Sequence, residues 1–304
     1  MSHSKLETMS QARRALYAKL QANRAKAQAG ADHEPVPLRS GDGPARLVLL
    51  HPSGGALFCY TPLVRALRPD VDVIGFPADP ADADLGLRTR LEVVAGRTLA
   101  ALARITDPGG CVFSGWSHGG ALAFEIARQH EAATGDHPSV VLLDAAYYGD
   151  RDADDESTVR SHFVYDFARL AGRDHAEVRA AVEAADPAVT SVRGLLEAAH
   201  VDPALTDAEL AERYDTFRSC ALGLLSYRPE ATFAGAVVLC VAEQADAIDA
   251  LWRRVATGPY RCVRLPGDHY TLFTPPVLPM LVGAIQDAAD ELAAVSAKKS
   301  GGDR

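Results

Sequence analysis

The chain has 304 residues, of which 48% are hydrophobic, so it can bury a sizeable core as one large domain or as one domain with an insertion. Its formal charge of -9 argues against sequence-independent binding to nucleic acid, because no excess of basic side chains exists to neutralise phosphates. The five cysteines form no Cys-x-x-Cys pair, which argues against a zinc site, and no apolar run reaches the length of a membrane span. An odd number of cysteines without a signal peptide predicts a cytoplasmic protein.

The first 40 residues differ in composition from the rest. From residue 9 to about residue 29 apolar side chains recur at helical spacing, which predicts an amphipathic helix. Residues 30–40, rich in glycine and proline, follow as a linker. A basic helix on an acidic protein can dock an acidic partner or pair with its own copy in a homodimer; the alternative is a solvated arm. Its basic side chains are Arg13, Arg14, Lys19, Arg24 and Lys26.

From residue 45 onward short apolar segments alternate with helical ones. The apolar segments are residues 46–50, 71–76, 111–114 and 140–143 and, after a long interruption, 237–241 and 261–265. This alternation predicts a mostly parallel sheet with helices on both faces. The interruption, residues 145–235, is 91 residues long, far more than one parallel crossover needs, so it predicts a helical lid inserted at about residues 147–233. We expect the domain to span residues 41–296 and the tail, 297–304, to be disordered.

Residues 115–119 read Gly-Trp-Ser-His-Gly and lie between an apolar strand and a helix. Three fixed residues in five recur by chance, but in an α/β-hydrolase this place in the chain carries the nucleophile elbow. Gly115 and Gly119 leave room where strand and helix converge, and the start of a helix favours negative charge that develops next to Ser117. The pattern predicts that Ser117 is a nucleophile; the alternative is a plain glycine-rich turn.

A serine nucleophile needs a base, and the triad of this fold runs serine, acid, histidine along the chain. His269 follows the last predicted strand and is the candidate base. Asp144 is the preferred acid because it directly follows the strand after the elbow, with no residue between. Asp246, five residues beyond the next strand, is the alternative. The acid would fix the imidazole tautomer and stabilise the imidazolium.

An oxyanion hole needs two backbone amides aimed at the carbonyl oxygen that becomes negative. One is expected from His118, the residue after the nucleophile, which contributes its backbone rather than its side chain. The other is expected from the loop after the first parallel strand, residues 51–55, where we favour the Ser53 amide over that of Gly54. The alternative for this loop is a tight turn with no catalytic role.

Four motifs together resemble a thioesterase domain of nonribosomal peptide or polyketide synthesis. They are His-Pro-Ser-Gly-Gly at 51–55, Gly-Trp-Ser-His-Gly-Gly at 115–120, Leu-Leu-Asp at 142–144 and Gly-Asp-His at 267–269. The resemblance covers about residues 45–290. An acid at Asp144 is similar to the chain-terminating, type I members, whereas stand-alone type II editing members usually carry it where Asp246 lies. Tyr270 stands where an aromatic residue such as Phe is common.

The resemblance implies an α/β-hydrolase fold, with a mostly parallel central sheet flanked by helices and a helical lid. It implies a substrate held on the phosphopantetheine arm of an acyl or peptidyl carrier protein. The chain, whether acyl, peptidyl or polyketide, would leave through an acyl-serine, by hydrolysis or macrocyclisation. No metal or bound organic cofactor is expected. The alternatives are a type II editing thioesterase or an acyltransferase of the same fold, and a non-catalytic module that binds acyl carriers.

Overall fold

A seven-stranded sheet forms the centre of the computed structural model, which describes residues 34–79, 91–148 and 156–301. The predicted N-terminal helix lies outside these residues. The strand order is β1-β3-β2-β4-β5-β6-β7, with only β1 antiparallel to its neighbour, which confirms the predicted mostly parallel sheet. The strands are β1 (Val36–Arg39), β2 (Arg46–Leu50), β3 (Asp72–Phe76), β4 (Cys111–Trp116), β5 (Ser139–Leu143), β6 (Val237–Val241) and β7 (Tyr260–Arg264).

Strand β1 corrects the sequence analysis, which assigned residues 30–40 to a linker. Val36 pairs with Gly75 and Pro37 with Ile74, so β1 extends the sheet beyond β3 as an edge strand. Proline weakens the prediction of a strand because it has no N–H to donate. The outer side of an edge strand has no neighbouring strand to accept a hydrogen bond, so the missing N–H of proline is tolerated there.

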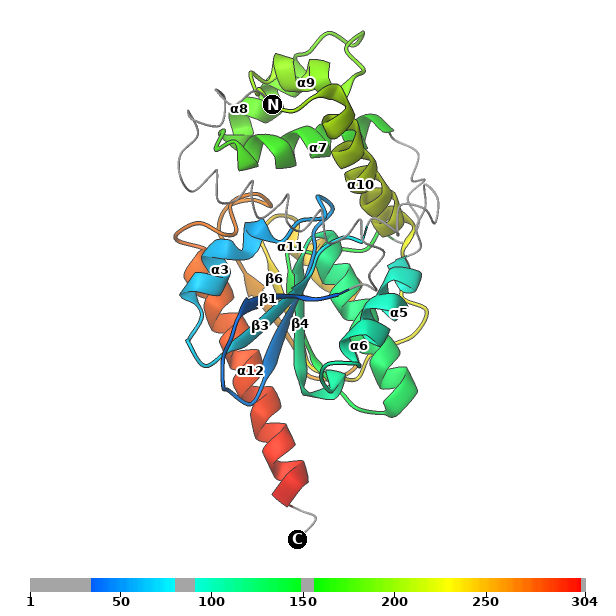
Figure 1. Cartoon of the computed structure of the whole chain (residues 1–304), viewed down its shortest axis with the longest axis vertical. Coiled ribbons are helices and arrows are strands. Elements are labelled where there is room, and N and C mark those ends of the chain that lie inside the picture. The colour runs from blue at the N-terminus through cyan, green and yellow to red at the C-terminus, as the bar shows by residue number, and fades with distance from the viewer. Residues whose placement is uncertain (1–33, 80–90, 149–155, 302–304) are drawn as a thin grey trace.

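Helices cover both faces of the sheet (Figure 1). Along β2, Val48 and Leu50 face one buried cluster, which α5, α6 and α11 complete, while Leu47 and Leu49 face another, completed by α3 and α12. A strand buried on both faces has apolar residues throughout, as the sequence of β2 does. The helices are α3 (Thr61–Ala66), α5 (Leu91–Leu102), α6 (His118–Thr134), α11 (Ala245–Trp252) and α12 (Leu278–Gly301), with short 3-10 helices η1 (Phe58–Tyr60) and η2 (Pro108–Gly110).

The described part of the region predicted as a lid contains four helices, which lie above the sheet in Figure 1. They are α7 (Glu156–Leu170), α8 (His175–Glu183), α9 (Val192–Ala198) and α10 (Asp207–Ser226). The lid has its own hydrophobic core, which includes Phe163, Leu196 and Phe217. Helix α10 begins with a capping box, in which Thr206 and Glu209 satisfy each other's backbone N–H. Across the described ranges no helix combines the length and apolar character needed to cross a membrane.

The C-terminal helix extends further than expected. We predicted a disordered tail from residue 297, but α12 continues to Gly301, and of that tail only residues 302–304 lie outside the described residues. Residues 284–300 contain neither glycine nor proline, so nothing in the sequence ends the helix before Gly301.

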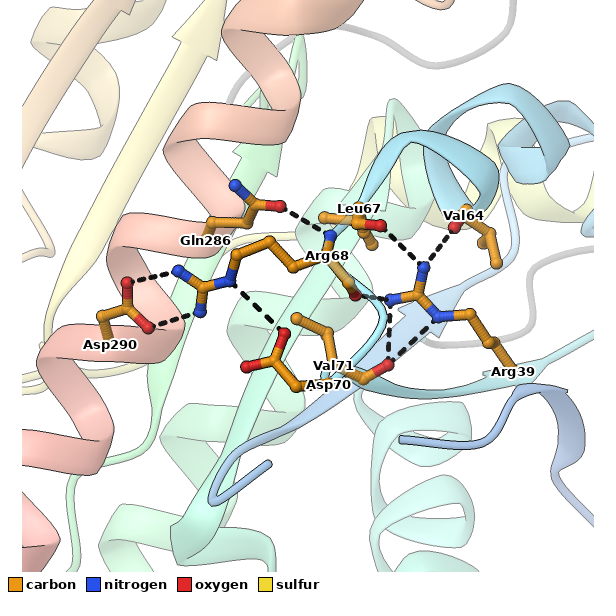
Figure 2. Close-up of polar contacts among 8 residues, drawn as sticks. All are labelled: Arg39, Val64, Leu67, Arg68, Asp70, Val71, Gln286 and Asp290. Carbon is orange, nitrogen blue, oxygen red and sulfur yellow. Dashed lines mark hydrogen bonds and ion pairs between the residues drawn. The ribbon is translucent and has the colours of Figure 1, made fainter. Parts of the chain in front are cut away.

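A cluster of arginine contacts fixes β1 and α3 to the body of the domain (Figure 2). The guanidinium of Arg39 donates to the backbone carbonyls of Val64, Leu67, Arg68 and Val71, at 2.6 to 3.2 Å. These carbonyls belong to the last turn of α3 and the chain after it, where a helix leaves acceptors without intrahelical donors. Arg39 therefore serves as a side-chain cap for the C-terminal end of α3.

Arg68 continues this cluster to α12. Its guanidinium contacts both carboxylate oxygens of Asp290, at 2.6 and 2.8 Å, and its backbone N–H donates to Gln286. A bidentate arginine–carboxylate pair constrains orientation as well as distance. The edge strand, α3 and the C-terminal helix are thus joined on one side of the sheet.

Candidate active site

Ser117 lies in a strained turn between β4 and α6. Its φ of 57° and ψ of -122° place a residue other than glycine at positive φ, a backbone state that costs free energy and persists only where its surroundings impose it. The turn requires glycine on either side. A Cβ at Gly119 would lie 2.4 Å from the carbonyl oxygen of Leu50, and one at Gly115 would lie 2.3 Å from the backbone of Gly119.

Backbone and tyrosine contacts hold this turn in place. The Ser117 N–H donates to the carbonyl of Leu143 at 3.1 Å. The Tyr60 hydroxyl donates to the carbonyl of Leu50 at 2.7 Å and accepts from the Trp116 N–H at 2.8 Å, so one phenol joins β2 to β4 where the strands part. Tyr60 is fully buried. Its role could not be predicted from the sequence, because its partners lie 10 and 56 residues away and no local pattern marks the contact.

The structure brings His269 and Asp144 together. His269 Nδ1 lies 2.6 Å from Asp144 Oδ2, and Asp144 Oδ1 accepts from the Ala242 N–H at 2.8 Å. Asp144 follows β5 at a φ of 46°, and its own N–H donates to the carbonyl of Cys240. The Asp144 side chain is 5% exposed and that of His269 27% exposed. Both carboxylate oxygens are therefore held, one on the imidazole and one on the backbone.

Asp246, the alternative acid, lies elsewhere. It is in the first turn of α11, its side chain is 90% exposed, and it forms an ion pair with Arg264 on the protein surface. The helix after β6 begins so soon that Asp246 is carried outward, whereas Asp144 stays at the sheet edge because it directly follows its strand. Of the two candidates, Asp144 is the one in contact with His269.

Ser117 lies next to this pair. Trp116 pairs with Leu143 in the β4–β5 ladder, so Ser117 and Asp144 follow paired residues of neighbouring strands. The ring of His269 stacks near that of Trp116, with centroids 4.9 Å apart. The Ser117 hydroxyl has no hydrogen-bond partner among the described residues.

The loop after β2 lies against the start of α6. The N–H of Gly55 donates to the carbonyl of Pro52 at 2.8 Å and closes a turn over Ser53 and Gly54. The ring of His118 stacks on that of His51, with centroids 5.2 Å apart. Burial lowers the pKa of His118 to about 4, so this imidazole is neutral near pH 7 and packs in the interior.

Two cavities flank this loop. One, of about 500 Å³, lies between α10 and the body of the domain, and His51, His118, Thr216 and Cys220 are among its lining residues. The other, of about 240 Å³, is lined from below by Gly54 and Gly55 and from above by α7 and α10. Thr216 of α10 lines both cavities. Their linings include His118, the residue after Ser117, and Gly54 and Gly55 of the loop after β2.

The lid is seated on the loop that carries His269. His162 Nδ1 lies 3.2 Å from the hydroxyl of Tyr270, and the ring of His175 lies 4.5 Å from that of Tyr270. His175 also lies 3.5 Å from a carboxylate oxygen of Asp268. Helices α7 and α8 therefore contact both neighbours of His269. The sequence did not indicate these contacts, because histidines within a helical insertion resemble ordinary surface residues.

Three side chains come nearest to a metal-ligating group among the described residues. Ligand atoms of His51, His118 and Cys220 lie within 4.8 Å of one another. The set has one side chain fewer than the four that a structural zinc site takes. Neither His269 nor Asp144 belongs to this cluster.

The sequence matches a family profile described as a thioesterase domain over residues 45–288. Two curated relatives are the thioesterase frbE of Dothideomycetidae sp. (strain 11243), 31% identical over 105 residues, and the thioesterase AMT4 of Alternaria alternata, 32% identical over 111 residues. The matches cover 34% and 36% of this chain, and 39% and 41% of those proteins. The chain thus matches about two fifths of the length of these relatives.

Solved structures resemble the whole fold. A four-domain nonribosomal peptide synthetase, AB3403, bound to AMP and glycine, matches 83% of this chain and 20% of its own, with a TM-score of 0.66 and 26% identity. The NocB thioesterase domain, in a covalent complex with a fluorophosphonate nocardicin G analogue, matches 84% of this chain and 98% of its own (TM-score 0.58, 23% identity). RedJ, a thioesterase of the prodiginine pathway in Streptomyces coelicolor, matches 83% and 96% (TM-score 0.57, 19% identity). These matches confirm the predicted α/β-hydrolase fold.

Proposed function

We propose that this chain, which belongs to the thioesterase domain family, releases a carrier-bound acyl, peptidyl or polyketide chain. The chain would leave through an acyl-serine at Ser117. The contact between His269 Nδ1 and Asp144 Oδ2, at the sheet edge beside the strained elbow, is the observation that carries this proposal. The type II alternative rested on Asp246 as the acid, and the exposure of Asp246 weighs against it.

The first half-reaction forms the acyl-serine. An ionised carboxylate only accepts, so the proton shared with Asp144 sits on Nδ1 of His269 and leaves Nε2 as the base. Nε2 takes the proton of the Ser117 hydroxyl as the oxygen attacks the thioester carbonyl. The imidazolium then returns this proton to the departing thiolate when the C–S bond breaks. The amides of His118 and Ser53 would hold the oxyanion, aided by the N-terminal end of α6.

The second half-reaction frees the chain. His269 takes a proton from the second nucleophile, which attacks the ester carbonyl, and then gives the proton to Ser117 as the ester bond breaks. When water is the nucleophile the product is a free acid, and when a hydroxyl or amine of the same chain attacks, the product is a macrocycle. The lid would choose between these outcomes by excluding water and folding the chain back, and the cavities under α10 supply space for the chain.

The partner in this proposal is an acyl or peptidyl carrier protein that presents the thioester on a phosphopantetheine arm. The similarity to a domain of a multidomain synthetase supports it. The reaction needs no metal or organic cofactor of its own. Pairing of two copies through the N-terminal helix stays a prediction.

Intact-protein mass spectrometry with a panel of acyl thioesters tests the proposal. The protein should gain the mass of the acyl group, with the adduct at Ser117, and Ser117→Ala should gain none while keeping its fold by circular dichroism. Hydrolysis by Ser117→Ala at the rate of the unmodified protein would show that another group performs the reaction.

A further inference from the structure

Helix α7 brings a carboxylate and a guanidinium over the active site. Asp166 lies against the loop after β2, since a Cβ built on Gly54 would be 3.0 Å from Asp166 Oδ2. One turn further along the helix, the guanidinium carbon of Arg169 lies 4.8 Å from the centre of the Trp116 ring, which also stacks near His269. Asp166 thus lies over the proposed oxyanion loop, and Arg169 packs on Trp116, the residue before Ser117.

These two groups line the same cavity and are only loosely paired with each other. Both border the cavity of about 240 Å³, and their side chains are 15% and 19% exposed. The distance between Arg169 Nη2 and Asp166 Oδ1 is 3.6 Å, too long for a hydrogen bond. In the described part of the chain, Nε of Arg169 is buried without a hydrogen-bond partner. Because both side chains border the cavity and are partly exposed, the carboxylate and the guanidinium can contact a ligand there through their exposed edges.

A carboxylate beside an oxyanion loop opposes the reaction unless its charge is compensated. Negative charge that develops on the substrate carbonyl is repelled by a nearby anion, and the repulsion is strong where water is excluded. Burial raises the pKa of Asp166, while Arg169 and His269 act in the opposite direction. A substrate N–H that donates to Asp166 would also offset this repulsion, and it would orient the chain.

We propose, resting on the thioesterase function above, that Asp166 and Arg169 select acyl chains with an amide group next to the thioester, as in N-acylaminoacyl or peptidyl chains. The amide N–H donates to the carboxylate of Asp166, and the amide carbonyl accepts from the guanidinium of Arg169. A chain with only carbon at this place leaves the buried carboxylate without a donor. A site built around such a polar group discriminates against a substrate that lacks the partner.

A matched pair of substrates isolates the N–H. One is the N-acetylcysteamine thioester of N-acetylalanine; the other is the 2-methyl-4-oxopentanoyl thioester, in which CH2 replaces that N–H and the carbonyl is kept. We expect kcat/KM to favour the amide about 10- to 100-fold, the range for a hydrogen bond to a charged group. In Asp166→Ala the preference should fall to about 1, and Asp166→Asn should keep part of it.

Two further variants separate this role from general damage. Arg169→Gln should slow both substrates alike, because both carry the carbonyl. Asp246→Asn, a surface change on the exposed acid, should leave the preference as it is. Equal kcat/KM for the two substrates in the unmodified protein, or a preference that survives Asp166→Ala, would overturn the selection by Asp166. Absence of an acyl-serine with either thioester would instead overturn the proposed function and this inference with it.

Discussion

At the scale of single residues, the proposed chemistry depends on how one carboxylate is held. Asp144 has one oxygen on His269 and the other on the N–H of Ala242, so the imidazole is fixed in both tautomer and direction. Loss of this carboxylate removes the acceptor that keeps the proton on Nδ1. The surface carboxylate of Asp246 has no comparable contact with the imidazole.

We therefore predict that Asp144→Asn lowers kcat by about 10⁴-fold, the magnitude known for loss of a triad acid. Asp246→Asn, the matched control, should change kcat by less than about twofold, because it alters an exposed ion pair. Steady-state hydrolysis of one thioester by both variants decides the assignment. A large loss in Asp246→Asn with a small one in Asp144→Asn would reverse it.

The buried imidazole of His118 should make the free energy of unfolding depend on pH in the acidic range. Its pKa in the folded protein, about 4, lies below that of an unfolded chain, about 6.5, so the unfolded state takes up the proton first as the pH falls. The stabilisation is complete above pH 6.5 and is lost towards pH 4. Urea unfolding at about pH 7 and pH 4.5 should show the wild type losing about 2 kcal/mol more than His118→Asn. Equal losses in the two proteins would mean that this imidazole is not buried in its neutral form.

Single-residue roles could be predicted where a motif marks them. Ser117, His269 and Asp144 follow strands in a fixed order, and that order placed all three at one sheet edge. Tyr60, Asp166 and Arg169 could not be found this way, because their partners come from distant elements and depend on where the lid is seated.

At the scale of elements, the meeting of β2, β4 and α6 leaves no space for side chains at the glycines of the elbow. The Cβ position of Gly119 is occupied by the backbone oxygen of Leu50, and a strand carbonyl cannot move aside as a flexible side chain can. Gly283, within α12, has no atom within 4 Å of its Cβ position among the described residues. Substitution by alanine should therefore destabilise the protein at Gly119 and stabilise it at Gly283.

Gly119→Ala should lower the free energy of unfolding by about 1–3 kcal/mol, as expected for overpacking at a tight contact. Gly283→Ala should raise it by up to about 1 kcal/mol, because alanine loses less conformational entropy than glycine in a helix. Chemical denaturation of both variants gives the comparison. Equal stability of Gly119→Ala and the unmodified protein would contradict the close approach of α6 to β2.

Helices and strands could be predicted where the spacing of the apolar residues and the length of the segment indicate the same element. Strands β2 to β6 are short, mostly apolar runs, and these five and β7 were each expected within two residues of their observed bounds. Strand β1 was missed because Pro37 obscures it, and the end of α12 was placed too early because polar residues suggested a tail. In β1, pairing with β3 outweighs the low strand propensity of proline. In α12, the absence of a helix breaker outweighs the polar composition.

At the scale of the whole molecule, the lid and the sheet domain have separate hydrophobic cores and meet at the active site (Figure 1). Their contacts there include the pairs His162–Tyr270, His175–Asp268 and Arg169–Trp116. The length of the insertion indicated a lid, but a sequence does not show which face of a helix touches the site. Substrate selection in our account belongs to this interface, and acyl transfer belongs to the sheet edge.

Labelling with a fluorophosphonate tests the central claim, that the strained serine beside the His269–Asp144 pair is the nucleophile. We predict one phosphonyl adduct per chain by intact mass, mapped to Ser117 by peptide sequencing, with none in Ser117→Ala and strongly slowed labelling in His269→Ala. An active, folded protein that gains no adduct, or gains it at another residue, would contradict the account.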